Sequence, residues 1–306
     1  MHSPNSKNTI SSKFTAACGA VCLLGAFATS AHADGGILFG SSTLFTGSGA
    51  TSADILASVD AFRAAIGGAN NGANNALGTL FTTGRREINW DAAALPVNMP
   101  ANFFNANSRR GAEFSTPGLG FDVSQNVAGS EFTEINAAYP SEFTVFSANR
   151  LFAPRDATAT DTKFFLPNFP TTAAGVQAFG AVFTDVDLVG VTGIELYGAG
   201  NQLLASAFAP TRDKGLSFVG LLLPSGALAT SVRLVNGNTP LGANNNDGQD
   251  IRGFFRDVVA MDDFIFSEPV AVPEVSQLLP AGLLGIGAGL MVWRRQRGAN
   301  SVVSTQ

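Results

Sequence analysis

The sequence predicts a mainly β protein, a jelly-roll-like antiparallel β-sandwich with an N-terminal helix. From residue 112 onward, short runs rich in Phe, Val, Leu and Thr are separated by Gly, Pro, Asn and Asp, as strands are by turns. No helical pattern separates these runs, which argues against a parallel α/β sheet. The chain has 306 residues with 34 Gly and 14 Pro, so it is long enough for a packed core and is not a low-complexity chain.

Residues 1–33 have the parts of a secretory signal peptide. A polar stretch with Lys7 and Lys13 precedes an apolar run over residues 14–28, which we expect to be helical, and alanines stand at positions 31 and 33. We expect export through the Sec translocon and cleavage by signal peptidase after Ala33. The alternative is a buried or membrane-spanning helix, but the run is short for a span of roughly 20 residues.

Residues 34–111 form an N-terminal lead-in with one clear helix over residues 51–66. Thr51 and Asp54 predict a capping box at its start, and Gly67 ends the run. Apolar residues recur at helical spacing and are expected to face the core: Ile55, Val59, Phe62 and Ile66.

Residues 112–270 are expected to form the β-sandwich. Alternation over residues 192–197 and 231–235 predicts strands with one dry and one wet face. The expected strands are 113–115, 120–124, 143–147, 163–166, 179–186, 193–197, 203–208, 216–223, 231–235 and 258–266.

The composition of the expected mature body, residues 34–272, excludes several chemistries. It holds 13 Lys and Arg against 22 Asp and Glu, a formal charge of −9, and this argues against nucleic acid as a partner. All of the chain's His and Cys precede residue 34, at His2, Cys18, Cys22 and His32. The body therefore has no Ser-His-Asp or Cys-His pair, no His-ligated zinc and no disulfide.

A second apolar run, residues 278–293, predicts a marginal membrane helix near the C-terminus. Arginines follow it at once, as suits a helix whose basic end stays cytoplasmic, and Val-Pro-Glu precedes it. This order of parts over residues 272–297 resembles a PEP-CTERM sorting signal, with Val275 where a second Pro is usual. The residues that carry the resemblance are Val272, Pro273, Glu274, Arg294, Arg295 and Arg297.

The resemblance implies processing by an exosortase, a membrane transpeptidase of Gram-negative bacteria. Such proteins are exported, associate transiently with the membrane through the C-terminal helix, and then reach the cell surface or the extracellular matrix, often beside exopolysaccharide. The alternative is a plain tail anchor without processing.

Several blocks of the body resemble an uncharacterised family of exported bacterial proteins. These blocks are residues 84–91, 102–105, 110–118, 149–152 and 179–187. The family has no established activity, so the resemblance implies one continuous domain and assigns no residue a role.

Asp185 and Asp187 are the strongest candidates for a metal site. They are two apart on an expected strand, so both carboxylates should lie on one face, where their repulsion calls for a cation. Ca²⁺ is the natural partner outside the cell, with Asp263 as a third ligand by analogy with sugar-binding sandwich modules. Asp262 and Asp263 are adjacent and expected on opposite faces. The alternative is that all these acids are ordinary surface residues. The Asn-rich stretch 244–250 is expected to be a turn-rich loop. The alternative is a calcium loop, which the stretch resembles in composition although it lacks the D-x-D-x-D-G order and a Glu at the twelfth position.

Trp90 is the candidate sugar platform, because it is the body's one Trp and lies in a segment with Arg85 and Arg86. The alternative is a cap on the core.

From these features we expect a non-catalytic structural or glycan-contacting module, with no cofactor beyond a structural calcium. The alternative is a glycoside hydrolase or lyase that uses paired carboxylates. A third possibility is a membrane-anchored adhesin that keeps its C-terminal helix.

Overall fold

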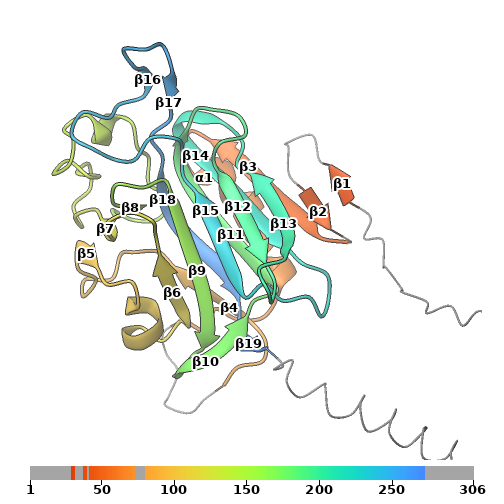
Figure 1. Cartoon of the computed structure of the whole chain (residues 1–306). Helices are drawn as coiled ribbons and strands as arrows, with labels where there is room; N and C mark the ends of the chain where they lie inside the picture. The colour runs from red at the N-terminus through yellow and green to blue at the C-terminus, as the bar shows by residue number, and fades with distance from the viewer. Residues whose placement is uncertain (1–28, 32–36, 40, 73–79, 273–306) are drawn as a thin grey trace, which may run out of the picture.

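The computed structural model describes residues 29–31, 37–39, 41–72 and 80–272, and over these it is a sandwich of two antiparallel sheets (Figure 1). The mainly β prediction is therefore confirmed. The expected cleavage site at Ala33, the helices of the signal peptide and of residues 278–293, and the sorting signal beyond Val272 lie outside the described residues. Among the described residues no helix combines the length and the apolar character that a membrane crossing needs.

The first sheet is in front in Figure 1, and its strands pair antiparallel throughout. In spatial order its strands are β1 (Thr29–Ala31), β2 (Ile37–Phe39), β13 (Leu203–Phe208), β12 (Gly193–Tyr197), β15 (Ser231–Val235), β9 (Ala159–Leu166), β10 (Phe169–Gly175) and β19 (Val270–Ala271), with β6 (Ala112–Ser115) also paired to β9.

The second sheet lies behind the first. In spatial order its strands are β3 (Thr43–Gly49), β14 (Arg212–Leu222), β11 (Ala178–Val186), β18 (Ala260–Ser267), β8 (Phe152–Pro154), β7 (Phe121–Val123) and β5 (Asn98–Met99), with β4 (Arg85–Ile88) also paired to β18. A separate hairpin, β16 (Gly248–Gln249) and β17 (Phe255–Arg256), and two single-turn helices, η1 (Phe103–Asn107) and η2 (Tyr139–Ser141), complete the described elements.

Helix α1 (Ser52–Ile66) covers the outer face of the second sheet and confirms the predicted helix. Asp54 Oδ2 accepts hydrogen bonds from Thr51 N–H (2.8 Å) and Thr51 Oγ1 (2.9 Å), as expected of the capping box. Gly67 ends the helix with φ 78°, a conformation that favours glycine. The helix buries Ile55, Val59 and Phe62 against residues of β11, β14 and β18.

The main core lies between the two sheets and is rich in Phe rings. Trp90 is at its centre, 1% exposed, and stacks on Phe152 at 4.1 Å between ring centroids. Edge contacts from Phe104 and Phe264 surround the indole, whose Nε1–H donates to Asp262 O (2.7 Å). Burial of so many large apolar side chains is the main stabilising contribution to the sandwich.

One expectation about an element needs correction. The expected strand over residues 143–147 is a loop, because its backbone N–H groups bond to side chains: Thr144 N–H donates to Thr184 Oγ1 (2.8 Å) and Phe146 N–H to Asp262 Oδ2 (2.6 Å). Strands from the expected lead-in take part in the sandwich, since β3 pairs with β14 and β4 pairs with β18.

Candidate functional site

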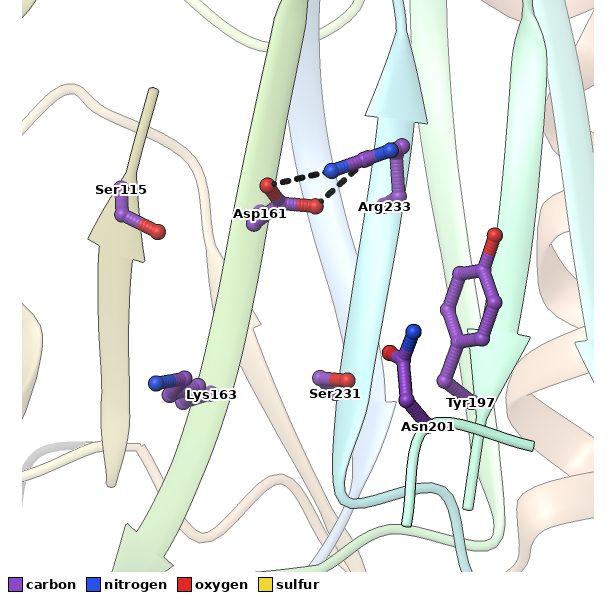
Figure 2. Close-up of a pocket in the computed structure, with 7 residues that line it drawn as sticks. All are labelled: Ser115, Asp161, Lys163, Tyr197, Asn201, Ser231 and Arg233. Atoms are coloured by element: carbon purple, nitrogen blue, oxygen red, sulfur yellow. Dashed lines mark hydrogen bonds and ion pairs between the residues drawn. The ribbon is translucent and has the colours of Figure 1, made fainter. Parts of the chain in front are cut away.

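A shallow polar pocket of about 300 Å³ lies on the outer face of the first sheet (Figure 2). Its lining residues come from β6, β9, β15 and β12 and from the turn after β12: Ser115, Asp161, Lys163, Tyr197, Asn201, Ser231 and Arg233. Their neighbours along the strands, such as Val232 and Leu234, face the core. The dry and wet faces predicted from the alternation are confirmed here.

Strand register arranges the lining residues in two rows across the sheet. Asp161 is the cross-strand partner of both Ser115 and Arg233. In the other row, Ser231 is the partner of both Lys163 and Tyr197. Because side chains on one face repeat every second residue, the rows run side by side and form a continuous polar surface.

Two interactions fix the geometry of this surface. The Arg233 guanidinium forms a two-pronged ion pair with Asp161, Nε to Oδ1 at 2.7 Å and Nη2 to Oδ2 at 2.9 Å (Figure 2). The Tyr197 hydroxyl donates to Glu195 Oε2 (2.5 Å), and this hydrogen bond, together with burial, raises the pKa of Tyr197 to about 12. The Tyr197 hydroxyl is therefore protonated and held in place at neutral pH.

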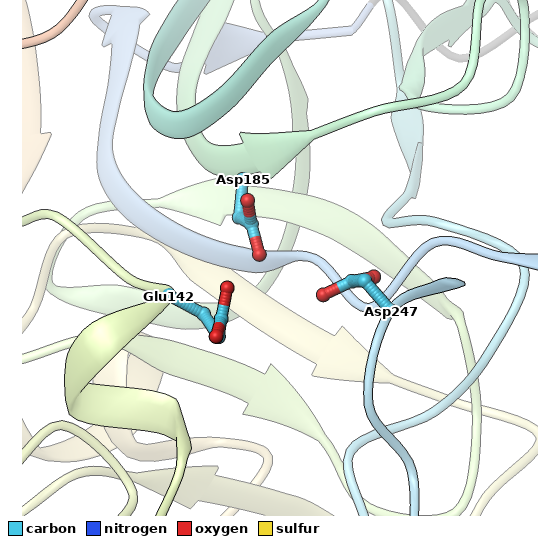
Figure 3. A group of neighbouring side chains, drawn as sticks. All are labelled: Glu142, Asp185 and Asp247. Carbon is cyan, nitrogen blue, oxygen red and sulfur yellow. The ribbon is translucent and has the colours of Figure 1, made fainter.

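A second candidate site lies at the end of the second sheet, where the carboxylates of Asp185 and Asp187 come together as the sequence predicted. Their oxygens form one group with Asp213, within 4.8 Å of one another. Asp185 also belongs to a second group of the same span, with Glu142 and Asp247 (Figure 3). The fully buried Asp185 thus links both groups.

An irregular β-bulge produces this arrangement. Thr184 pairs with Leu216 and Val186 pairs with Arg212, so residues 213–215 of β14 lie opposite Asp185 alone. Asp185 takes φ 67°, a left-handed conformation that Asp tolerates better than most residues. The bulge brings Asp213 beside Asp185, a proximity that the period-two pattern of a regular strand does not reveal.

The other two carboxylates reach Asp185 from loops. The buried Tyr139 of η2 joins them, because its hydroxyl donates to Asn245 O (2.8 Å) and accepts from Gly242 N–H (2.9 Å). This ties the loop that carries Asp247 to the helix turn that ends at Glu142. Sequence reasoning missed Glu142. Asp247 lies in the stretch 244–250, whose composition resembles a calcium loop, but no local pattern shows that this loop meets Asp185.

Burial and mutual repulsion shift the pKa values of these acids upward. Burial, followed by repulsion from Asp247 and Asp187, raises the pKa of Asp185 to about 9. Burial and repulsion from Asp247 raise that of Asp187 to about 6. Burial and repulsion from Asp187 and Asp247 raise the pKa of Asp257 to about 6, although Asp257 accepts hydrogen bonds from Asp187 N–H and Leu188 N–H (both 3.2 Å). Ionising these carboxyl groups therefore costs more free energy than it does for carboxyl groups in water.

Asp263 lies elsewhere, in a second acidic pair with Asp262. Both residues lie opposite Val182 in a bulge of β18, since Ala181 pairs with Phe264 and Phe183 with Met261. The expectation of opposite faces is therefore wrong: Ser147 Oγ donates to Asp263 Oδ1 (2.7 Å) and contacts Asp262 Oδ1 (3.2 Å). Arg63 Nη2 lies 3.9 Å from Asp263 Oδ2. Asp263 thus belongs to this buried pair and to neither group of carboxylates around Asp185.

Trp90 offers no surface for a sugar. Its indole is 1% exposed and packs among Phe rings, so the structure places it in the core and the sugar-platform interpretation needs correction. Tyr197 is the aromatic residue that lines the polar pocket on the first sheet.

No protein-family model, curated protein or solved structure matches the chain.

Proposed function

We propose that this protein is an exported β-sandwich module that contacts glycan through the first-sheet pocket, without catalysis, at the cell surface or in the extracellular matrix. The observation that carries the proposal is the pocket itself, a polar hollow on the outer face of a rigid sheet. Binding groups on strands are positioned more precisely than groups on loops.

The lining suits a polyhydroxylated ligand. Hydroxyl groups of Ser115 and Ser231, the amide of Asn201 and the charged ends of Lys163 and Arg233 offer donors and acceptors across the two rows. Tyr197 adds an aromatic surface for the C–H face of a sugar ring. Pockets for apolar small molecules are instead lined mostly by hydrophobic side chains.

The pocket's chemistry favours binding over hydrolysis. Asp161 is the one carboxylate among the lining residues, and Arg233 holds both of its oxygens. Glycoside hydrolysis needs a pair of carboxyl groups that flank the scissile bond.

The second candidate function is a carbohydrate-active enzyme, and Asp185 with Asp187 is the observation that favours it. Their carboxylate oxygens lie within 4.8 Å of each other, and a retaining glycosidase uses two carboxyl groups about 5–5.5 Å apart.

The expected export and sorting signals complete the proposal. The signal peptide ending at Ala33 takes the chain through the Sec translocon, and the PEP-CTERM-like segment 272–297 makes it an exosortase substrate, with exopolysaccharide as the polymer met at its destination.

A jelly-roll-like connection fits the sandwich, because β11 and β14 lie in one sheet while β12, β13 and β15 lie in the other.

The test measures binding of the purified protein to exopolysaccharide from its host by affinity electrophoresis. Tyr197→Ala and Arg233→Ala should each weaken binding by roughly tenfold. The matched control is Phe255→Ala, which removes an aromatic ring 60% exposed on the separate β16–β17 hairpin. Equal retention of all three variants, or no binding by the unchanged protein, contradicts the proposal.

Size-exclusion chromatography of the same polymer separates the two candidate functions. Unchanged polymer after incubation favours the binding module. A shift to shorter polymer that Asp187→Asn abolishes establishes the enzyme.

A further inference from the structure

We propose that the carboxylates around Asp185 form a divalent-cation site of the Ca²⁺ class at the end of the second sheet. This site is distinct from the proposed glycan pocket, which lies on the other sheet, so each can be tested without the other.

The first support is an unpartnered oxygen. Asp185 is fully buried and its Oδ1 accepts from Lys214 N–H (2.7 Å), but none of the described residues donates a hydrogen bond to Oδ2. A buried carboxylate oxygen without a donor is costly, and native structures usually satisfy such groups. Figure 3 shows the carboxylate of Asp185 directed toward Glu142 and Asp247, so a cation between the three would satisfy it.

The second support is the donor set. Each group around Asp185 places three carboxylate oxygens within 4.8 Å of one another, without sulfur or nitrogen ligands. Hard cations prefer such oxygen ligands, and Ca²⁺ accepts six to eight of them in flexible geometry, whereas Mg²⁺ requires near-octahedral geometry and gives up its water reluctantly. Ligands from two loops and a bulged strand suit the more tolerant ion.

Lys214 is the competing cation on the protein itself. Its Nζ lies 3.1 Å from Glu142 Oε2, and its side chain is 54% exposed. One surface ammonium cannot balance five neighbouring carboxylates: Glu142, Asp185, Asp187, Asp213 and Asp247. The other competitor is a proton shared between Asp185 and Asp247, which would satisfy Oδ2 without any metal.

A cation bound between Glu142, Asp185 and Asp247 would join three stretches of chain that the sequence keeps apart. Glu142 follows η2, Asp185 is in β11 and Asp247 precedes β16. Because a ligand that binds only the folded state raises stability, the site would lock this end of the sandwich.

The experiment is thermal unfolding of the EGTA-treated protein with CaCl₂, paired with calorimetric titration. We expect a melting temperature higher by roughly 5–10 °C at about 100 times Kd, with Kd of about 10⁻³ M or tighter, the range of extracellular modules. MgCl₂ at the same concentration is the control for ionic strength.

Asp185→Asn is the decisive variant. Asn tolerates the left-handed conformation at this position and its Oδ1 can still accept from Lys214 N–H, so the variant should fold. It should lose the calcium response. Asp60→Asn, which removes an exposed acid from α1, should keep it.

An unchanged melt of the original protein with EGTA and with CaCl₂ overturns the proposal and supports the shared proton. The calcium assignment is also overturned if CaCl₂ raises the melting temperature of Asp185→Asn as much as that of the original protein. It is overturned as well if MgCl₂ raises the melting temperature of the original protein as much as CaCl₂ does.

Discussion

Arg86 and Glu268 form a buried two-pronged ion pair that links the N-terminal part of the chain to its last strands. Arg86 Nη2 lies 2.7 Å from Glu268 Oε1, and Nε donates to Oε2 at 2.7 Å. Both side chains are almost fully shielded from solvent, and Asn71 Nδ2 also donates to Glu268 Oε2 (2.8 Å). Because both side chains are buried, water cannot solvate either charge when its partner is removed.

Glu268→Gln should therefore lower the free energy of unfolding by about 3–5 kcal/mol, because it leaves the Arg86 charge buried without a counter-charge. Denaturant unfolding of the purified variant measures this loss. The control is Asp161→Asn in the exposed pair with Arg233, where the expected loss is at most about 1 kcal/mol. Similar losses at both positions would contradict the role of burial.

Phe62 of α1 fits against two facing glycines, and this fit predicts a second set of effects. A Cβ at Gly220 would lie 2.9 Å from Phe62 Cδ2, and a Cβ at Gly180 would lie 2.8 Å from Phe62 Cε1. Gly220→Ala should cost about 1–3 kcal/mol of stability through overpacking. The Phe62→Leu change should cost less in the Gly220→Ala background than alone, and simple additivity in the double-mutant cycle would refute the contact.

Asp263 predicts a pH dependence of stability. Burial raises its pKa to about 6, above the value of about 3.9 in an unfolded chain. Between about pH 4 and pH 6 the folded state holds a proton that the unfolded state releases, so this group's contribution to stability falls as the pH rises through that window.

Asp263→Asn should flatten the stability profile in that window and raise stability at pH 7 by about 2 kcal/mol. Urea unfolding from pH 4 to pH 7 in EGTA tests this, with Asp60→Asn as a control for the loss of one negative charge. A parallel profile for Asp263→Asn and the original protein would rule the effect out.

The N-terminus of α1 predicts a local effect. Thr51→Ala removes the side chain whose Oγ1 bonds to Asp54 Oδ2, and it should cost about 1 kcal/mol. The neighbouring Ser52→Ala change is the control. Equal thermal stability of the two variants would show that the cap does not contribute.

Local patterns predicted α1 and most of the longer strands, because capping residues, periodicity and turn residues act over a few positions. The same logic failed at residues 143–147, where the apolar pattern suits a strand but Thr184 and Asp262 side chains take the backbone hydrogen bonds. It also failed at β4, whose charged sequence hides the pairing with β18. Tertiary contacts decided both elements.

The candidate sites show the same limit. The proximity of Asp185 and Asp187 is a local property and could be predicted, whereas Glu142 and Asp247 join them only through loop packing around Tyr139. The bulges that bring in Asp213 and turn Asp262 and Asp263 toward Ser147 also break the regular strand period on which sequence reasoning depends. The pocket depends on strand order, which alternation alone does not determine.

Because Trp90 stacks inside the sandwich, the protein carries its own optical reporter. Trp293, the chain's other tryptophan, lies in the segment that sorting would remove, so the mature body would have a single indole fluorophore. Its emission should be blue-shifted and shielded from iodide while the two sheets stay together, and it should shift to the red when they separate. Fluorescence at this one residue would then follow the integrity of the core directly, without a label.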